Sequence, residues 1–241
     1  LAIVAHVDHG KTTLVDCLMR QSGVFRANQD VPEQALDSGE LERERGITIL
    51  AKCTSVEWKG CRINIVDTPG HADFGAEVER VLSMVDGCLL LVDAAEGPMP
   101  QTKFVLAKVL RQGLHPIVII NKVDRTDGRP IQVLDEIFDL FVTLEADESQ
   151  LDFPVLYGSS KQGWFASEPT GPKETLEPLF QLILNHVKAP KIEHESPFRM
   201  LVTTLESNAF LGRILTGRIQ SGSIAANGRA KAISTDGTQL E

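Results

Sequence analysis

Short apolar runs alternate along the chain with longer stretches in which apolar residues recur at the helical period. The short runs, which predict strands, are Leu1–Val4, Ile63–Val66, Cys88–Val92, Ile117–Ile120 and Val155–Tyr157. The longer stretches, which predict helices, are Thr13–Arg20, Glu77–Val85, Gln101–Gln112, Val133–Leu144 and Leu176–Val187. Because strands alternating with helices of about 10–15 residues build parallel βαβ units, the pattern predicts an α/β domain whose mostly parallel sheet carries helices on both faces.

Three segments depart from this alternation. Ile49–Trp58 and Cys61–Asp67 are joined by Lys59-Gly60, which predicts a hairpin and an antiparallel edge strand, bringing the sheet to six strands. Residues 23–46 are polar and aperiodic, and a loop of that length inside a domain is usually functional or mobile. Residues 163–174 contain two prolines and two glycines and predict an exposed loop.

The pattern changes near residue 195, where β-branched residues become frequent. Residues 200–204 and 212–219 predict strands, with turns at Ser221-Gly222 and Asn227-Gly228. This is typical of the beginning of an all-β barrel. We therefore expect a first domain over residues 1–194 and an incomplete β-barrel domain over residues 195–241. Because the second stretch is too short for a closed barrel, we expect the chain to be a fragment, trimmed also just before its first residue.

Composition limits the class of protein. The chain has 241 residues, 42% of them hydrophobic, which is enough for one full α/β core and part of a second domain. No run of about 18 apolar residues occurs, so no membrane span is expected. The apolar start lacks the basic residues of a signal peptide and is expected to be a core strand.

Cysteine spacing and charge point to the compartment and the partners. The four cysteines show no C-x-x-C spacing, which argues against zinc and favours buried or free thiols in a reducing, cytoplasmic compartment. The net charge of −9 creates no overall attraction to nucleic acid. Docking on RNA would therefore need a local patch or a missing part of the protein.

The residues after the first predicted strand are typical of a phosphate-binding loop. They read Ala5-His6-Val7-Asp8-His9-Gly10-Lys11-Thr12-Thr13, and we expect the residues from His6 onward to bind nucleotide through backbone N–H groups and the helix N-terminus. Lys11 should reach the β and γ phosphates, and the Thr12 hydroxyl should bind magnesium. Ala5 stands where the template G-x-x-x-x-G-K-[ST] has its first glycine, so Gly10 must adopt the difficult backbone angle. The alternative is an ordinary helix N-terminus behind a buried strand.

Two further segments carry candidates for magnesium and γ-phosphate binding. Asp67 ends a predicted strand and can hold magnesium through a water, while the N–H of Gly70 can sense the γ phosphate. The alternative there is an Asp-Pro-Gly turn. At the end of the long polar loop, the Thr48 hydroxyl can complete the magnesium shell when a γ phosphate is present. Its alternative is a simple turn into the strand at Ile49.

Base recognition is assigned to residues after two later strands. Asn121-Lys122-Val123-Asp124 offers a carboxylate that can accept hydrogen bonds from the ring N–H and the amine of guanine. Adenine lacks both donors and would leave the carboxylate unpaired, at a cost of a few kcal/mol. The Lys122 stem can cover the base while Asn121 braces the phosphate loop. Ser159-Ser160-Lys161 can present a backbone N–H to the guanine carbonyl.

The order of these motifs resembles the five signatures of translational GTPases, and the match is to the BipA (TypA) family. The segments that carry the resemblance are residues 5–13, Asp37-Ser38, residues 41–52, residues 67–75, Gly97-Pro98-Met99-Pro100-Gln101-Thr102, Leu151-Asp152-Phe153-Pro154 and Pro197-Phe198. An alanine at the position of Ala5 is also usual in that family. The resemblance covers nearly the whole chain and implies a P-loop GTPase fold followed by the second domain of a translational GTPase.

The resemblance also implies activity, cofactors and partners. It implies GTP hydrolysis stimulated by the ribosome, acting in ribosome assembly and in stress or cold adaptation. The expected ligands are GTP or GDP and Mg²⁺, with a monovalent cation near Asp8. His71 matches the catalytic histidine that orients the attacking water, and Val7 with Ile47 resembles its apolar gate. The expected partner is the ribosome, through rRNA and ribosomal proteins and largely through missing domains; we expect a cytoplasmic, ribosome-associated monomer that binds neither membrane nor DNA.

Several alternatives remain open at this point. An elongation factor G or LepA relative is the nearest, and a binding module in which GTP orders the long loop and hydrolysis is incidental is a second. An ATPase or nucleotide kinase would share the phosphate loop but not the Asn121-Lys122-x-Asp124 motif. The pair His6-x-x-His9 is disfavoured as a metal site because it lies inside a phosphate loop.

Overall fold

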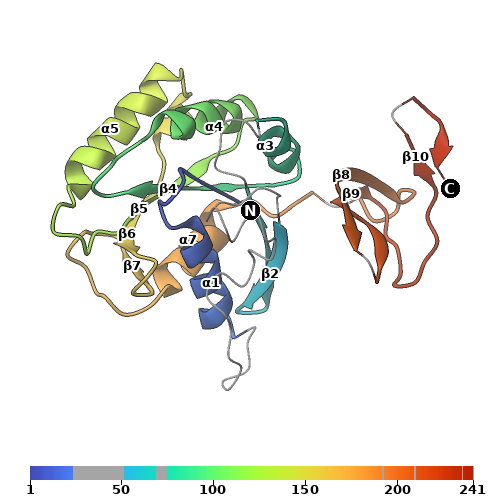
Figure 1. Cartoon of the computed structure of the whole chain (residues 1–241), viewed down its shortest axis with the longest axis horizontal. Coiled ribbons are helices and arrows are strands. Elements are labelled where there is room, and N and C mark those ends of the chain that lie inside the picture. Colours follow the sequence, from blue (N-terminus) through green and yellow to red (C-terminus); the bar gives the residue numbers. More distant parts are fainter. Residues whose placement is uncertain (24–51, 69–74, 192, 209, 235, 241) are drawn as a thin grey trace. The chain divides into compact units, whose positions relative to one another are not determined.

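The computed structural model describes residues 1–23, 52–68, 75–191, 193–208, 210–234 and 236–240. These residues form two compact units, Leu1–Ala189 and Pro190–Glu241 (Figure 1). Our predicted domain boundary, between residues 194 and 195, lies shortly after this division. The predictions for the loop within residues 24–51 and for residues 69–74 concern positions outside the described residues. Among the described residues, no helix has the length and apolar character to cross a membrane.

The first unit is built on one seven-stranded sheet in the order β2-β3-β1-β4-β5-β6-β7. Its strands are β1 (Ala2–Ala5), β2 (Lys52–Trp58), β3 (Cys61–Asp67), β4 (Cys88–Asp93), β5 (Pro116–Asn121), β6 (Val155–Ser159) and β7 (Trp164–Ala166). The five inner strands pair in parallel, and β2 and β7 pair antiparallel at the two edges. The predicted hairpin at Lys59-Gly60 is therefore confirmed.

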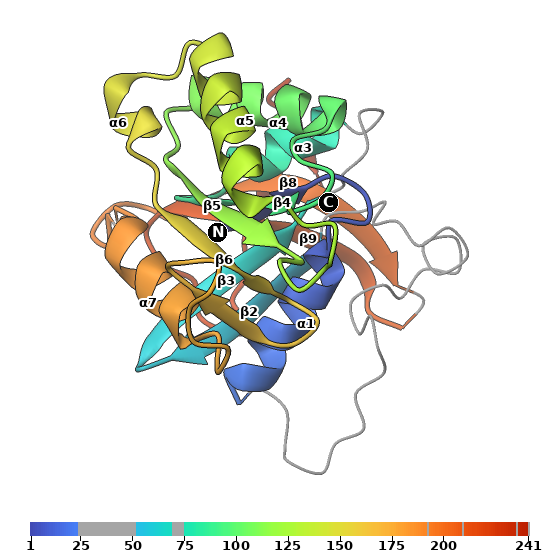
Figure 2. The same cartoon turned by 90° about the vertical axis from the view of Figure 1, so that its left-hand side faces the viewer.

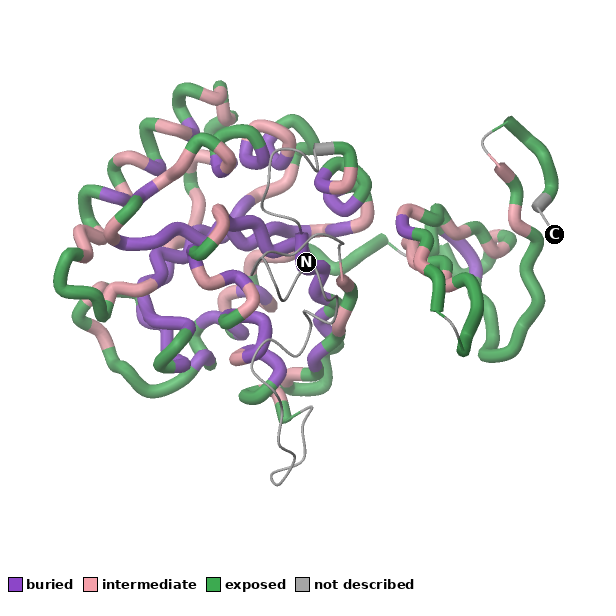
Figure 3. The backbone as a smooth tube through the Cα atoms, in the orientation of Figure 1, coloured by how far each residue is buried: buried purple, intermediate pink, exposed green. Residues whose placement is uncertain are grey.

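Helices cover both faces of this sheet, as the pattern predicted (Figure 2). They are α1 (Lys11–Gln21), α3 (Gly75–Leu82), α4 (Pro100–Arg111), α5 (Pro130–Thr143), α6 (Glu148–Leu151) and α7 (Glu177–His186). Alternate residues of one strand point to opposite faces: Leu90 and Val92 pack with residues of α3, α4 and α5, whereas Leu89 and Leu91 pack with α1 and α7. Burial on both faces explains the continuous apolar runs of the parallel strands (Figure 3).

The sheet has one strand more than we predicted. Residues 163–174 were expected to form an exposed loop, but Trp164–Ala166 is buried and pairs with β6 as the edge strand β7. Gly158 makes this pairing possible, because a Cβ there would lie 2.2 Å from the carbonyl oxygen of Trp164. The prediction was wrong because the prolines and glycines of the rest of the loop outweighed three apolar residues whose strand partner is distant in sequence.

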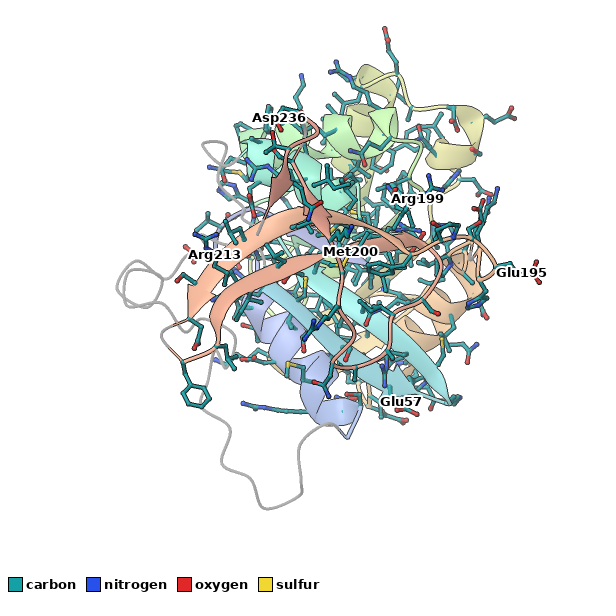
Figure 4. The ribbon with its side chains drawn as sticks, turned by 90° about the vertical axis from the view of Figure 1, so that its right-hand side faces the viewer. Glu57, Glu195, Arg199, Met200, Arg213 and Asp236 are labelled. Atoms are coloured by element: carbon teal, nitrogen blue, oxygen red, sulfur yellow. The ribbon has the colours of Figure 1, made fainter. Side chains whose placement is uncertain are left out.

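The secondary-structure elements described in the second unit are all β strands. β8 (Arg199–Asn208) and β9 (Gly212–Ser221) form an antiparallel pair, and β10 (Ala232–Ile233) pairs with β11 (Gln239–Leu240). Figure 4 shows the β8–β9 ribbon with Arg199 and Arg213 at opposite ends. A β region therefore follows the first unit, as predicted, and its identity as part of a barrel stays a prediction.

Candidate nucleotide-binding site

The polar motifs gather at one edge of the sheet. The inner strands run parallel, so their carboxyl ends, at Ala5, Asp67, Asp93, Asn121 and Ser159, lie along the same edge. Ligands of open α/β sheets bind at this edge, because the loops that leave the strands converge there. The phosphate loop follows Ala5, and the candidate base-reading residues follow Asn121 and Ser159.

The phosphate loop has the backbone conformation of an anion-binding loop. Ala5 ends the extended strand β1, and Gly10, with φ 95° and ψ 26°, lies directly before the first residue of α1. We predicted this left-handed angle for Gly10, but Asp8 also has a positive φ, of 65°. Such left-handed residues turn successive N–H groups toward one concave side, next to the partial positive charge of a helix N-terminus.

Lys11 lies at the centre of this loop and is almost fully buried. Its Nζ is 3.0 Å from Oδ1 of Asp67 and also donates to the carbonyl oxygen of Thr68. The Thr68 hydroxyl in turn donates to the carbonyl oxygen of Ile3 at 2.6 Å. The end of β3 is thereby tied both to β1 and to the phosphate loop, which brings the candidate lysine and the candidate magnesium aspartate together.

The oxygen donors present suit magnesium. Asp67 is fully buried at the end of β3, and Thr12 lies next to Lys11 at the start of α1. No group of three or more His, Cys, Asp or Glu side chains arranged for a metal occurs among the described residues. One carboxylate and one hydroxyl, completed by phosphate oxygens and water, match the hard-oxygen shell that Mg²⁺ prefers.

Asn121 connects three loops of the site. Its Nδ2 donates to the carbonyl oxygen of His9 at 2.8 Å, and its Oδ1 accepts from the Ser160 N–H at 2.8 Å and from the Ser160 hydroxyl at 3.0 Å. The contact with the phosphate loop is the one that we expected of Asn121. Since both Asn121 and Ser160 are buried, this network fixes the phosphate loop relative to the serine turn.

Lys122 and Asp124 lie beside this network on the more exposed side. Lys122 has a positive φ of 60°, and its Nζ donates to the carbonyl oxygen of Asp8 at 2.6 Å. Asp124 is exposed, and its Oδ2 accepts from Nε2 of Gln162 at 3.4 Å. Gln162 is itself oriented by the Trp164 ring N–H, which donates to its Oε1 at 2.9 Å. The carboxylate proposed to read the base is thus held from β7.

His9 is a buried, neutral part of the same loop. Its Nδ1 accepts from the backbone N–H of Asp93 at 3.3 Å, and its Nε2 lies 3.4 Å from a carboxylate oxygen of Glu96. Burial, reinforced by the nearby His6 ring, lowers the pKa of His9 below its ordinary value. The side chain therefore helps to position the loop as a hydrogen-bonding group without adding charge.

Two residues of this site were not predicted from the sequence. Four predicted residues lie outside the ranges that the structure describes. Asp93 and Gln162 were not singled out, although Asp93 could have been, because it is a lone acid closing a buried apolar run just as Asp67 does. Gln162 carried no signal in its neighbours. Ile47, Thr48, Gly70 and His71 lie outside the described residues. The remaining predicted positions include Val7 and the exposed Lys161, in loops of this edge, and the exposed Thr13, in the first turn of α1.

Similarity to known proteins shows to which family the chain belongs. The model of the elongation factor Tu GTP-binding domain matches residues 1–189 of the chain. The chain belongs to the elongation factor Tu GTP-binding domain family. This confirms the P-loop GTPase fold that the motifs predicted.

Individual members of this GTPase family are similar over nearly the whole chain. The large ribosomal subunit assembly factor BipA of Synechocystis sp. is 54% identical over 99% of the chain, and that of Haemophilus influenzae is 56% identical over 98%. The predicted resemblance to BipA is thus confirmed. The chain spans about 40% of the length of these relatives. Among solved structures, translation elongation factor SelB of Methanococcus maripaludis, in complex with the GTP analogue GppNHp, is similar with a TM-score of 0.66 and 25% identity, covering 92% of this chain and 41% of SelB.

Replacing Gly10 by alanine is expected to destabilise the first unit even without nucleotide. A Cβ there would lie 2.6 Å from Nδ2 of Asn121, and the positive φ strains any other residue. We expect a loss of about 1–3 kcal/mol in the free energy of unfolding, measured by urea denaturation. Gly113→Ala is the matched control, since Gly113 has φ +69° but no atom within 4 Å of the added Cβ. Equal losses in the two variants would show that the contact with Asn121 does not constrain the loop.

Proposed function

We propose that this chain is the GTP-binding part of a BipA-type translational GTPase, which hydrolyses GTP to GDP and phosphate when stimulated by the ribosome. The observation that carries the proposal is that two groups meet the phosphate loop at the carboxyl edge of the sheet. Asp67 pairs with Lys11, and Asn121, which accepts from Ser160, donates to the carbonyl oxygen of His9. The names of the relatives, large ribosomal subunit assembly factors, support the ribosome as partner and ribosome assembly as the process.

On the phosphate side, the chain supplies positive charge and fixed donors. Lys11 and the N–H groups of residues 6–13 would hold the β and γ phosphates in line with an attacking water. The Lys11 ammonium is paired with the buried Asp67, which holds it at the end of the phosphate loop. Thr12, Asp67 and Thr48 would hold Mg²⁺, which offsets charge on the phosphate oxygens.

On the base side, the chain supplies discrimination. The Asp124 carboxylate would accept the guanine ring N–H and amine, and the Lys122 stem would lie along the base. The backbone N–H of Lys161 would face the guanine carbonyl oxygen, in a turn that Asn121 fixes by accepting from the Ser160 N–H. The preference for GTP over ATP follows because adenine lacks the ring N–H and the amine from which Asp124 would accept hydrogen bonds.

Catalysis is assigned to a histidine that the ribosome brings into place. We propose that His71 orients the attacking water and that Val7 and Ile47 keep it away until the partner docks. Gly70 and Thr48 would sense the γ phosphate. The domain assignment completes the proposal: residues 1–194 bind nucleotide and residues 195–241 begin the second domain of a longer, cytoplasmic, ribosome-associated monomer. A monovalent cation near Asp8 stays a prediction.

The proposal is tested by multiple-turnover GTP hydrolysis with and without ribosomes. The full-length protein is expected to hydrolyse GTP slowly alone and much faster with ribosomes, whereas the present chain alone should remain slow. Stimulation by ribosomes with GTP but not ATP would support the assignment. An unchanged rate with ribosomes, alongside tight GTP binding, would instead favour a nucleotide-sensing module without turnover.

Replacing His71 by alanine in the full-length protein is expected to separate turnover from binding. GTP affinity should stay within about twofold, because the side chain is assigned to water rather than to the nucleotide. Ribosome-stimulated turnover should fall by about 10²–10⁴-fold, the usual contribution of a group that positions or deprotonates a nucleophile. His194→Ala, in the second unit, serves as the control. Full turnover by the His71 variant would remove its assigned role.

A further inference from the structure

A buried carboxylate joins the base-reading loop to the phosphate loop. Asp93 ends β4, and its side chain has no exposed surface. Its Oδ1 accepts from the backbone N–H of Ala95 at 2.7 Å, and its Oδ2 lies 2.7 Å from Nζ of Lys122. A buried carboxylate is costly unless it is paired and hydrogen-bonded, so Asp93 strongly favours the one position of Lys122 that pairs with it.

Lys122 is consequently fixed both at its side-chain ammonium and at its backbone. The ammonium that contacts Asp93 also donates to the carbonyl oxygen of Asp8 in the phosphate loop. At the other end, the Lys122 backbone directly follows the buried Asn121 and has φ 60°. With both ends held, the four-carbon stem has fewer rotamers open to it than a free lysine has.

Other charged groups around Asp93 do not replace this pair. Arg125 Nη1 is 3.4 Å from Oδ2 of Asp93, but the guanidinium is more exposed and is held by both carboxylate oxygens of Asp127. Burial acts to raise the pKa of Asp93, yet hydrogen bonds from Lys122 and Ala95 and the charges of Lys122 and Arg125 outweigh it and lower the pKa below its ordinary value. Asp93 is therefore ionised at neutral pH and Lys122 is its shortest ionic contact.

Resting on the proposed function, we infer that Asp93 is a positioning residue for guanine nucleotides, acting entirely through Lys122. By holding the ammonium against the phosphate loop, it orders the Lys122 stem before the base arrives. A binding group that is already ordered loses less conformational entropy when the ligand binds. The same pair links the two halves of the site, since Lys122 belongs to the base-reading loop and Asp8 to the phosphate loop.

The inference is tested by the release rate of a fluorescent GDP analogue from the chain with magnesium present. Asp93→Asn keeps the shape and the acceptor for the Ala95 N–H but removes the charge, and we expect release to become about tenfold faster. In a Lys122→Met background, which keeps an apolar stem without the ammonium, Asp93→Asn should change release by less than about twofold. Asp127→Asn, a neighbouring exposed acid, is the matched control and should change release less than about twofold.

The combined variant separates positioning from a general loss of structure. If Asp93 only supported the fold, Asp93→Asn would accelerate release equally with and without the Lys122 ammonium, and that result would overturn the inference. Unchanged release by Asp93→Asn alone would overturn the inference as well. In that case, tight GDP binding by the wild-type chain would still support the proposed function. Failure of the wild-type chain to bind GDP would overturn the proposed function and this inference together.

Discussion

Replacement of Lys11 by alanine is expected to abolish tight binding of GTP and GDP. Lys11 is nearly buried between the phosphate loop and β3, and its ammonium is the charge on this edge best placed to meet the phosphates. Truncating one partner of a buried charge pair costs about 2–5 kcal/mol. The dissociation constant should therefore rise by roughly 30- to 4,000-fold, measured by titration with a fluorescent GTP analogue.

The control for this variant is a lysine in the β2–β3 turn, at the opposite end of β3 from the Asp67 that pairs with Lys11. Lys59 is exposed in the turn between β2 and β3, where its Nζ lies 2.8 Å from a carboxylate oxygen of Glu177. Lys59→Ala should leave the affinity within about twofold, because exposed ion pairs contribute little. Lys11→Ala also leaves Asp67 without this partner, so its unfolding midpoint is measured alongside. A folded Lys11→Ala protein with wild-type affinity would contradict the phosphate-loop assignment.

Replacement of Asp124 by asparagine is expected to exchange guanine preference for xanthine preference. Xanthine carries a carbonyl where guanine carries its amine, so an asparagine N–H can donate to xanthine but faces a second donor in guanine. A site built on such hydrogen bonds rejects the wrong partner by about 10⁴-fold. The base preference of the wild-type and Asp124→Asn proteins is measured by displacing fluorescent GDP with unlabelled GDP or with xanthosine diphosphate.

Two observations would decide this experiment. Asp139→Asn changes an exposed acid on α5 and should keep the guanine preference, which controls for the loss of one negative charge. Unchanged GDP affinity in Asp124→Asn would contradict the base assignment. The contact with Gln162 makes the test sharper, because an asparagine amide at position 124 can still accept from Nε2 of Gln162 through its oxygen.

The inner strands and the covering helices were predictable because their signals are local. A strand buried on both faces, such as β4 or β5, is apolar along its length up to the polar residue that ends it, and this produces the uninterrupted runs seen in the sequence. Once these runs are placed in a parallel sheet, the residues after them must share one edge. The convergence of Lys11, Asp67 and Asn121 follows from that rule together with the motif spacings.

What could not be predicted depends on contacts between residues distant in the sequence. β7 forms a strand because Gly158 of β6 allows the β7 backbone to approach closely. The residues Trp164–Ala166 themselves give no sign of this pairing. Asp8 has a positive φ, and its carbonyl oxygen accepts from Lys122, more than a hundred residues away. Asp93 and Gln162 become part of the site only when the fold brings them to Lys122 and Asp124.

The central claim is that this edge of the sheet binds a guanine nucleotide. Titration of the chain with fluorescent GDP and with fluorescent ADP, both with magnesium, tests it most directly. The account predicts saturable binding of one GDP per chain with a preference over ADP of about 10³-fold or more. Equal affinities for the two nucleotides, or no saturable binding of GDP, would contradict it.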